Sequence, residues 1–281
     1  MKWRPGGRSA HIEDQRGQSR GRGRGVKRLG LGTIVVGIAL YYFLGQDVLG
    51  LLSTQSETAS THGQPTSEQD EELVQFISFV LDDLQSTWQQ TFAKQGQTFR
   101  HTNLVLFTDE IQSACGFSSA ATGPFYCPAD QKIYIDLGFY RQLRDNLGAP
   151  GDFAQAYVLA HEMAHHIQTL LGISTTVARQ RRTAPSKANE LSIRQELQAD
   201  CFAGVWAYST KRRNLLDPGD IEEGLRTAAS IGDDRLQKRS TGRVAPETWT
   251  HGSSRQRVQW FQRGLSSGSI TDCDTFSSRH L

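Results

Sequence analysis

Two histidines separated by three residues, with a glutamate directly after the first, form the segment of this chain best suited to chemistry. His161, Glu162 and His165 stand in the order His-Glu-x-x-His. On a helix, imidazoles four residues apart share one face, so both can bind one metal ion. Glu162 lies about 100° round the helix from His161, where it can contact a metal-bound water. The pattern therefore predicts a hydrolytic zinc site.

The helix that must carry this motif is predicted over residues 153–171. Gly151 and Asp152 supply a start signal and Gly172 a stop signal. The two motif histidines lie at the flank of its apolar stripe, where the wall of a cleft would be; the next residue, His166, is not counted as a ligand. The stripe recurs at steps of three and four residues and is made by Phe153, Tyr157, Ala160, Ala164, Ile167 and Leu171.

A catalytic zinc usually has three protein ligands and one position for water. Metallopeptidases with a third histidine six residues after the second do not match, because Leu171 stands there. Glu196 and Asp200 share one face of a second predicted helix, at about 186–210. We expect Glu196 to be the third ligand and Asp200 to accept a hydrogen bond from the outer nitrogen of a ligand histidine. The alternative is a solvated acidic face, which the apolar residues around the pair disfavour.

A third element adds two candidate catalytic side chains. His251 and Arg257 lie at the start of a predicted helix that runs to about Gly264. Near a metal, a histidine and an arginine could stabilise the oxyanion that forms when water attacks a peptide carbonyl. Taken alone, an exposed histidine with nearby arginines is also ordinary protein surface.

In this order, the three elements resemble those of gluzincin metallopeptidases with an HExxH, an ExxxD and an HxxxxxR motif. More closely, the chain resembles a bacterial family of neutral zinc metallopeptidases that are single-pass membrane proteins. The resemblance covers residues 70–276 and includes the basic N-terminus with its apolar segment. It implies a periplasmic location and no particular substrate. It is carried by residues 123–130, 133–137, 151–155, 198–204, 231–236 and 250–252.

Charge is distributed unevenly along the 281 residues. Residues 1–28 hold nine Lys/Arg against two acidic residues, whereas the rest of the chain is net acidic. Alternating Arg and Gly from Arg20 to Gly25 could indicate nucleic-acid binding. No aromatic residues are interleaved and an apolar segment follows, so a cytoplasmic flank is favoured and no nucleic-acid partner is expected.

The apolar segment, residues 29–52, contains one polar break at Gln46 and Asp47. Its length suits one transmembrane helix. A cleaved signal peptide is the alternative, but a small-x-small cleavage site is missing and the basic leader is long. We therefore expect an uncleaved signal anchor, with residues 1–28 as a cytoplasmic tail and the bulk of the chain exported.

Cysteine usage is consistent with export. Cys115 and Cys127 bracket a short loop and are expected to form a disulfide in an oxidising compartment. Cys201 and Cys273 could pair with each other, or Cys201 could be a small buried apolar residue. A zinc site made of all four is disfavoured because no Cys-x-x-Cys spacing occurs.

After a flexible linker at residues 53–67, a single domain is expected over residues 68–281. It begins with a helix over 68–94, and the clearest strands are residues 103–108 and 132–136, followed mainly by helices. The predicted fold is a helix-rich, zincin-like α+β domain with a small sheet, preceded by one transmembrane helix. Under this plan an extended peptide would pair with an edge of the sheet at the 132–136 strand.

These features predict a metallopeptidase with one zinc ion, an endopeptidase rather than an exopeptidase, acting on extracytoplasmic proteins or peptides. Glu162 would be the general base, and a single helix would hold the enzyme at the membrane. A membrane-anchored binding or scaffold protein with an inactive zinc site is one alternative, and an exported binding domain without metal is another. The presence of Glu162 and of an open fourth position on the metal favours the enzyme.

Overall fold

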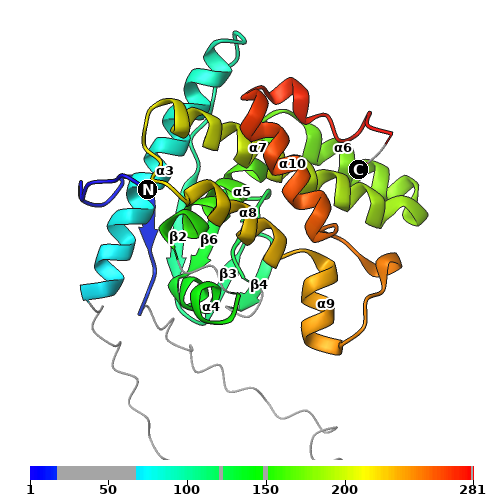
Figure 1. Ribbon diagram of the computed structural model, residues 1–281, viewed down its shortest axis with the longest axis horizontal. Helices are drawn as coiled ribbons and strands as arrows, with labels where there is room; N and C mark the ends of the chain where they lie inside the picture. The colour runs from blue at the N-terminus through cyan, green and yellow to red at the C-terminus, as the bar shows by residue number, and fades with distance from the viewer. Residues whose placement is uncertain (18–67, 120–122, 148–150, 280) are drawn as a thin grey trace, which may run out of the picture. The chain divides into compact units, whose positions relative to one another are not determined.

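The computed structural model describes residues 1–17, 68–119, 123–147, 151–279 and 281. The expected membrane anchor and the linker after it lie outside these residues. No helix within the described residues is long and apolar enough to cross a membrane. These residues form a helix-rich α+β fold with a small mixed sheet, as the sequence predicts (Figure 1).

The main sheet has four strands in the order β1-β2-β6-β5. The first three are parallel neighbours, and β5 runs antiparallel to β6. In both β2 and β6 every residue after the first is buried, as expected for strands covered on both faces. A separate hairpin is made by β3 (Glu110–Ser113) and β4 (Gly116–Ser119). The bounds of the main strands are β1 (Ile12–Asp14), β2 (Asn103–Phe107), β5 (Phe125–Cys127) and β6 (Lys132–Asp136).

Strand β6 is central, so the expectation that a peptide pairs with its edge is wrong. Tyr134 of β6 is registered with Val105 of β2 on one side and with Phe125 of β5 on the other. Both sides of its backbone are therefore used. The edge nearest the metal helix α5 (Asp152–Leu170) is β5, which contacts that helix. A strand of three residues after a Gly/Pro loop carries too short a pattern to be predicted.

The helices begin and end close to the predicted residues. The metal helix α5 ends at Leu170, and Gly172 separates it from α6 with a φ of 75°, the left-handed conformation that glycine adopts easily. Figure 1 shows α5 beside β2 and β6, and α7 and α10 packed side by side. The other bounds are α3 (Glu68–Ala93), α4 (Leu137–Leu147), α6 (Ile173–Thr183), α7 (Ala188–Arg212), α8 (Asp220–Ser230), α9 (Asp233–Thr241) and α10 (Ser254–Ser267).

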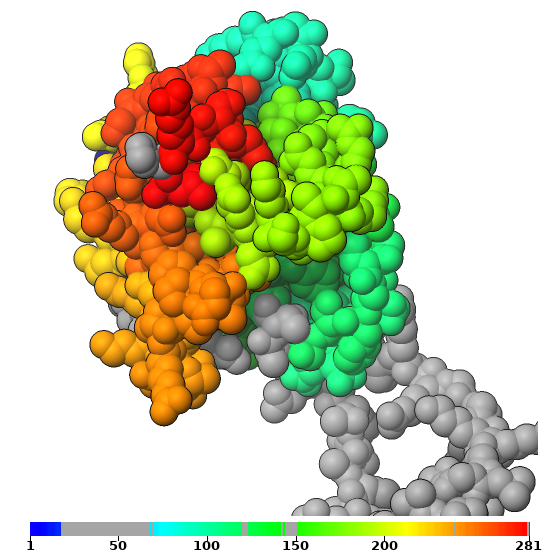
Figure 2. Space-filling model, turned by 90° about the vertical axis from the view of Figure 1, so that its right-hand side faces the viewer, coloured from blue at the N-terminus to red at the C-terminus, as the bar shows by residue number. Residues whose placement is uncertain are grey.

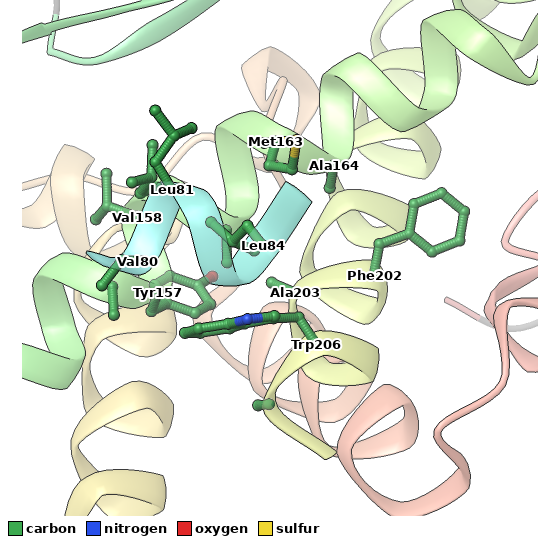
Figure 3. Packing of buried hydrophobic residues seen from close by; sticks show 14 of the residues in the cluster. Val80, Leu81, Leu84, Tyr157, Val158, Met163, Ala164, Phe202, Ala203 and Trp206 are labelled. Atoms are coloured by element: carbon green, nitrogen blue, oxygen red, sulfur yellow. The ribbon is translucent and has the colours of Figure 1, made fainter. Parts of the chain in front are cut away.

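Helix α5 lies within the hydrophobic core, and most of its residues are buried. Apolar side chains of α3 and α7 pack against it and against each other (Figure 3). The contact is made by Val80, Leu81 and Leu84 of α3, Tyr157, Val158 and Met163 of α5, and Phe202, Ala203 and Trp206 of α7. The two helices that carry the predicted ligands, α5 and α7, are thus fixed against each other.

Helices α7 and α10 approach closely because each contributes a glycine. A methyl group added at Gly204 would overlap the carbonyl oxygen of Phe261, and one at Gly264 would overlap that of Cys201. Small residues at a helix crossing let the backbones come together. This contact brings the start of α10 toward the acidic face of α7.

Two disulfides tie loops to this core. Cys115 pairs with Cys127, as predicted. Cys201 pairs with Cys273, which the sequence left undecided. The second bond holds the short helix η4 (Ile270–Cys273) on α7. Figure 2 shows the C-terminal segment in red lying against the yellow-green residues of α6 and the start of α7.

Residues Met1–Arg16, expected from the sequence to belong to a separate basic tail, form one compact unit with the domain. Strand β1 within this segment pairs with β2 of the sheet. Figure 1 shows the blue N-terminal residues beside α3. Strand β1 has the sequence Ile-Glu-Asp, with a single apolar residue, so no local hydrophobic pattern predicts it.

Candidate metal centre

The fold brings the three predicted ligands together. The candidate ligand atoms of His161, His165 and Glu196 all lie within 4.8 Å of one another. Nε2 of His161 is 3.1 Å from one carboxylate oxygen of Glu196, and Nε2 of His165 is 3.6 Å from the other. The two rings stand at 87° to each other with centroids 4.9 Å apart. Two imidazoles and one carboxylate form a donor set that zinc binds in hydrolytic enzymes.

Each histidine has an oxygen acceptor at its outer nitrogen. Nδ1 of His161 is 3.0 Å from Oδ1 of Asp200, as predicted. Nδ1 of His165 is 2.9 Å from Oε1 of Gln168, a partner that the sequence reasoning missed. Both Nε2 atoms are left to face Glu196. The missed signal was spacing, because Gln168 follows His165 by three residues on the same helical face.

Gln168 is itself held from two sides. Its Nε2 donates to the backbone oxygen of Gln195 at 2.7 Å and to Oε1 of Gln198 at 3.1 Å. A carbonyl oxygen only accepts, so the amide oxygen of Gln168 must face His165. Gln198 in turn donates to the backbone oxygen of Cys273 at 3.1 Å. The orientation of His165 thus depends on α7 and on the disulfide-linked C-terminal segment.

Asp200 is fully buried and lies at the centre of a second network. Arg257 donates to it through Nε at 2.8 Å and Nη2 at 2.9 Å, a bidentate ion pair. The hydroxyl of Tyr157 also donates to Asp200 in a short hydrogen bond. Arg257 is only 2% exposed, and its Nη1 donates to the backbone oxygen of Ile231. Its guanidinium is therefore directed at Asp200, which favours a positioning role over contact with a substrate.

These contacts perturb the titration of the site. Burial lowers the pKa of His161, but the hydrogen bonds with Asp200 and Glu196 outweigh it and raise that pKa to about 10. Burial also lowers the pKa of His165, and the charge of Glu196 raises it by more. For Glu196, burial raises the pKa, whereas the two imidazoles bring it well below its usual range. The carboxylates thus favour the protonated imidazoles, which opposes metal binding, because a metal ion binds the neutral imidazole.

Glu162 is in place beside the ligands and is 8% exposed. A tyrosine that the sequence did not single out, Tyr140 of α4, lies close enough to feel its charge. Burial, and then the charge of Glu162, raises the pKa of Tyr140. Its hydroxyl has no hydrogen-bond partner within the described part of the chain. Helix α4 directly follows β6, so the position of β6 in the sheet determines that Tyr140 lies near Glu162.

His251 lies at the rim of the site with half of its side chain exposed. Asp233 holds it, accepting from its backbone N–H at 2.7 Å and contacting Nδ1 at 3.2 Å. The hydrogen bond with Asp233 raises the pKa of His251, burial opposes this, and the negative charge of Glu196 adds to the rise. The charge of Glu196 thus acts on His251, whose catalytic role stays a prediction; its partner Asp233 was not among the predicted site residues.

His166 is a structural residue, in agreement with its exclusion as a ligand. It is fully buried. Nε2 is 2.7 Å from the backbone oxygen of Arg100, and Nδ1 is 3.1 Å from the hydroxyl of Tyr126. Both ring nitrogens therefore have partners other than a metal. They connect α5 to β5 and to the segment before β2.

Sequence comparisons agree with this geometry. A family profile described as "Putative neutral zinc metallopeptidase" matches residues 1–276. The chain is 44% identical to the uncharacterized protein YpfJ of Escherichia coli (strain K12) over 285 residues, which cover 98% of this chain and 99% of the relative. It is 43% identical to the uncharacterized protein Mb2605 of Mycobacterium bovis over 194 residues, 65% of each chain. No solved structure matches. The chain therefore belongs to the neutral zinc metallopeptidase family.

Proposed function

We propose that the protein is a zinc-dependent endopeptidase that hydrolyses peptide bonds of extracytoplasmic proteins or peptides. The observation that carries this proposal is the convergence of His161, His165 and Glu196, with Glu162 next to the first histidine. Two hydrogen-bonded imidazoles and one ionised carboxylate suit zinc and leave a coordination position for water. Both disulfides favour an oxidising compartment.

A zinc ion held by these three ligands would supply Lewis-acid activation of water and of the scissile carbonyl. The Glu162 carboxylate accepts the proton of the attacking water and passes it to the leaving amine. His251, which Asp233 keeps protonated to higher pH, donates a hydrogen bond toward the oxyanion. Arg257 and Tyr157 act through Asp200, which they hold against the ring of His161.

The edge strand β5 supports the choice of an extended polypeptide as substrate. It contacts α5, and within the described residues β6 is its only partner in the sheet. Its outer backbone groups can therefore pair with a peptide strand laid beside the metal centre. Main-chain pairing of this kind holds an internal stretch of chain, which favours an endopeptidase.

The test compares the full-length protein with Glu162→Gln on an unfolded protein substrate. Without a carboxylate to take the proton, cleavage should fall about 10²–10⁴-fold while zinc content stays unchanged. His165→Ala should lose both zinc and cleavage. Glu72→Gln, which changes an exposed glutamate of α3, is the matched control and should behave like the parent. Parental turnover by Glu162→Gln would rule out the proposed mechanism.

A further inference from the structure

We propose that residues 1–16 are a built-in part of the peptidase domain, and that residues 16 and 68 therefore lie on the same side of the membrane. The segment between them holds the apolar residues 29–52 expected to contact the bilayer. A single crossing there would place the N-terminus and the metal centre on opposite sides. The contacts of residues 1–16 with the domain require them to be on one side.

Backbone pairing is the first of these contacts. Strand β1 is parallel to β2, with Ile12 opposite Leu104 and Asp14 opposite Leu106. The backbone N–H of Leu104 donates to the oxygen of His11 at 2.8 Å, and that of Gln15 donates to the oxygen of Leu106 at 2.8 Å. Without β1, this side of the buried strand β2 would be an unpaired edge. The sheet is therefore incomplete without the N-terminal segment.

Charged side chains of the leader are paired within the domain as well. Arg8 donates to both carboxylate oxygens of Glu71 on α3, at 2.7 and 2.6 Å. Arg16 reaches the same carboxylate at 3.1 Å. On the other side, Glu13 pairs with Lys132 of β6 at 2.8 Å. Exposed pairs of this kind add little stability individually. They show, however, that two arginines counted toward a cytoplasmic flank are used by the fold.

Apolar contacts anchor the beginning of the segment. Met1 is 7% exposed and belongs to the main hydrophobic core. The ring of Trp3 packs edge-on against Phe76 of α3, with centroids 5.4 Å apart. The terminal ammonium lies 2.7 Å from the carboxylate of Asp152, the first residue of the metal helix. The N-terminal segment thus touches both α3 and α5.

The topological consequence follows from chain length. When both ends of a segment are fixed in one domain, the segment crosses a membrane an even number of times. Two crossings by helices would need roughly 17–25 apolar residues each. Residues 29–52 supply enough for one span only. The segment is therefore expected to attach the enzyme to a membrane surface without carrying the domain across.

The N-terminal segment lies within the region that the chain shares with its family. The family profile matches from residue 1, and the alignment with the E. coli relative covers 98% of this chain. The N-terminal strand is thus part of the region shared with the family. A tail that served only to orient a membrane anchor would not need a defined partner strand in the sheet.

A cross-link tests the association directly in membranes that contain the full chain. Ser9 donates to Asp82 of α3 at 2.5 Å, so Ser9→Cys combined with Asp82→Cys places two thiols side by side. All four native cysteines are in disulfides, so only the new thiols react. After oxidation, and cleavage at a protease site inserted among residues 53–67, the N-terminal fragment should stay attached to the domain until reductant is added.

The matched control is Ser9→Cys with Lys94→Cys, whose second thiol is exposed after the far end of α3. It should release the fragment. Release by the Ser9–Asp82 pair as well, in a protein that still unfolds cooperatively on heating, would overturn the proposal. A cross-link between two chains would be seen as doubled mass before cleavage, and it would also count against the proposal.

The side of the membrane is tested with an impermeant thiol reagent on intact cells. Ala10→Cys and Ser186→Cys, two exposed positions, are labelled in separate full-length variants. We expect both thiols to react before lysis, because the disulfides favour an oxidising compartment for the whole domain. If neither thiol reacts before lysis, residues 10 and 186 still lie on one side of the membrane, but that side is the cytoplasm. Labelling of Ser186→Cys alone would restore the single crossing and refute the proposal, whatever the outcome of the peptidase assay.

Discussion

At the scale of single residues, the metal centre is organised by the outer nitrogens of its two histidines. His161 meets a carboxylate, Asp200, which is ionised and paired with Arg257. His165 meets the neutral amide of Gln168. A carboxylate partner increases the basicity of an imidazole ligand more than an amide does, so His161 is the more strongly electron-donating of the two. The two histidines therefore have different supports although the motif makes them look equivalent.

Replacement of Gln168 tests whether its neutral amide orients the ring of His165. Gln168→Leu removes the acceptor at Nδ1 of His165 and frees the ring to turn. Zinc affinity, measured by competition with a chelator, should fall about 10–100-fold. Gln259→Leu, at an exposed position of α10, is the control for adding an apolar side chain. Unchanged zinc affinity in Gln168→Leu would show that the packing of α5 alone orients His165.

At the scale of elements, the contact of α7 with α10 determines whether Arg257 reaches Asp200. Arg257 lies near the start of α10, and Asp200 lies mid-way along α7. The backbones meet at Gly204 and Gly264, where neither position has room for a methyl group. The two glycines are remote from the metal in sequence, yet they set the distance of the buried ion pair.

Gly204→Ala is expected to separate these helices. The added methyl would overlap the backbone oxygen of Phe261, which cannot rotate away. Overpacking of this kind costs about 1–3 kcal/mol of unfolding free energy, measurable by urea denaturation. Zinc affinity should fall with it, because Arg257 moves from Asp200. Gly6→Ala, where a methyl would make only an ordinary contact, should change neither quantity.

The loop before α10 should make stability depend on pH. Asp233 accepts from the backbone N–H groups of Thr250, His251 and Gly252 and contacts the His251 ring. Burial raises the pKa of Asp233, but hydrogen bonds from His251 outweigh this and lower it. The hydrogen bond with Asp233 raises the pKa of His251 despite its burial. The two pKa shifts have opposite signs, so the stability from Asp233 is lost at low pH and the stability from His251 is lost at high pH.

The aspartate contributes stability above its unfolded pKa of about 3.9 and loses it as pH falls through the lower folded pKa. The histidine contributes below about pH 6.5 and loses it as pH rises through the higher folded pKa. The difference in unfolding free energy between the parent and Asp233→Asn should therefore be largest between about pH 4 and 6.5. Urea denaturation across pH 3–9 measures it. A difference that does not vary with pH would contradict the assigned ion pair.

At the scale of the whole molecule, covalent links join distant parts of the chain to the site. The Cys201–Cys273 bond closes a loop of 72 residues, whereas Cys115–Cys127 closes one of 12. The backbone oxygen of Cys273 also accepts a hydrogen bond from Gln198. Gln198 in turn accepts one from Gln168, the residue that contacts the outer nitrogen of His165. The longer link therefore connects the C-terminal segment to the metal ligands.

The two bonds should differ in effect when each pair is replaced by alanine. Loss of Cys201–Cys273 should cost about 4 kcal/mol of unfolding free energy and loss of Cys115–Cys127 about 3, because the longer loop restricts the unfolded chain more. Zinc affinity should fall only in the first variant. Denaturation and zinc titration of both variants measure this. Equal zinc affinities would show that the C-terminal segment does not support His165.

Local patterns predicted the helices well because their signals lie within a few turns of chain. The apolar stripe, Asp152 at the start and Gly172 at the end indicated α5 to within one residue. Glu196 and Asp200 were found because their spacing on one helix is itself a local property. Strand β5 and Asp233 were missed, since a strand of three residues and a loop carboxylate acquire their roles only from distant partners.

The sequence by itself determined the donor set, since His161, Glu162, His165, Glu196 and Asp200 can be recognised from spacing on two helices. Tertiary structure alone decided which groups support them. The placement of Gln168, Arg257 and Tyr140, the central position of β6 and the return of residues 1–16 to the sheet each depend on contacts between segments far apart in the chain. Such contacts are settled by the packing of the whole core, which no local pattern encodes.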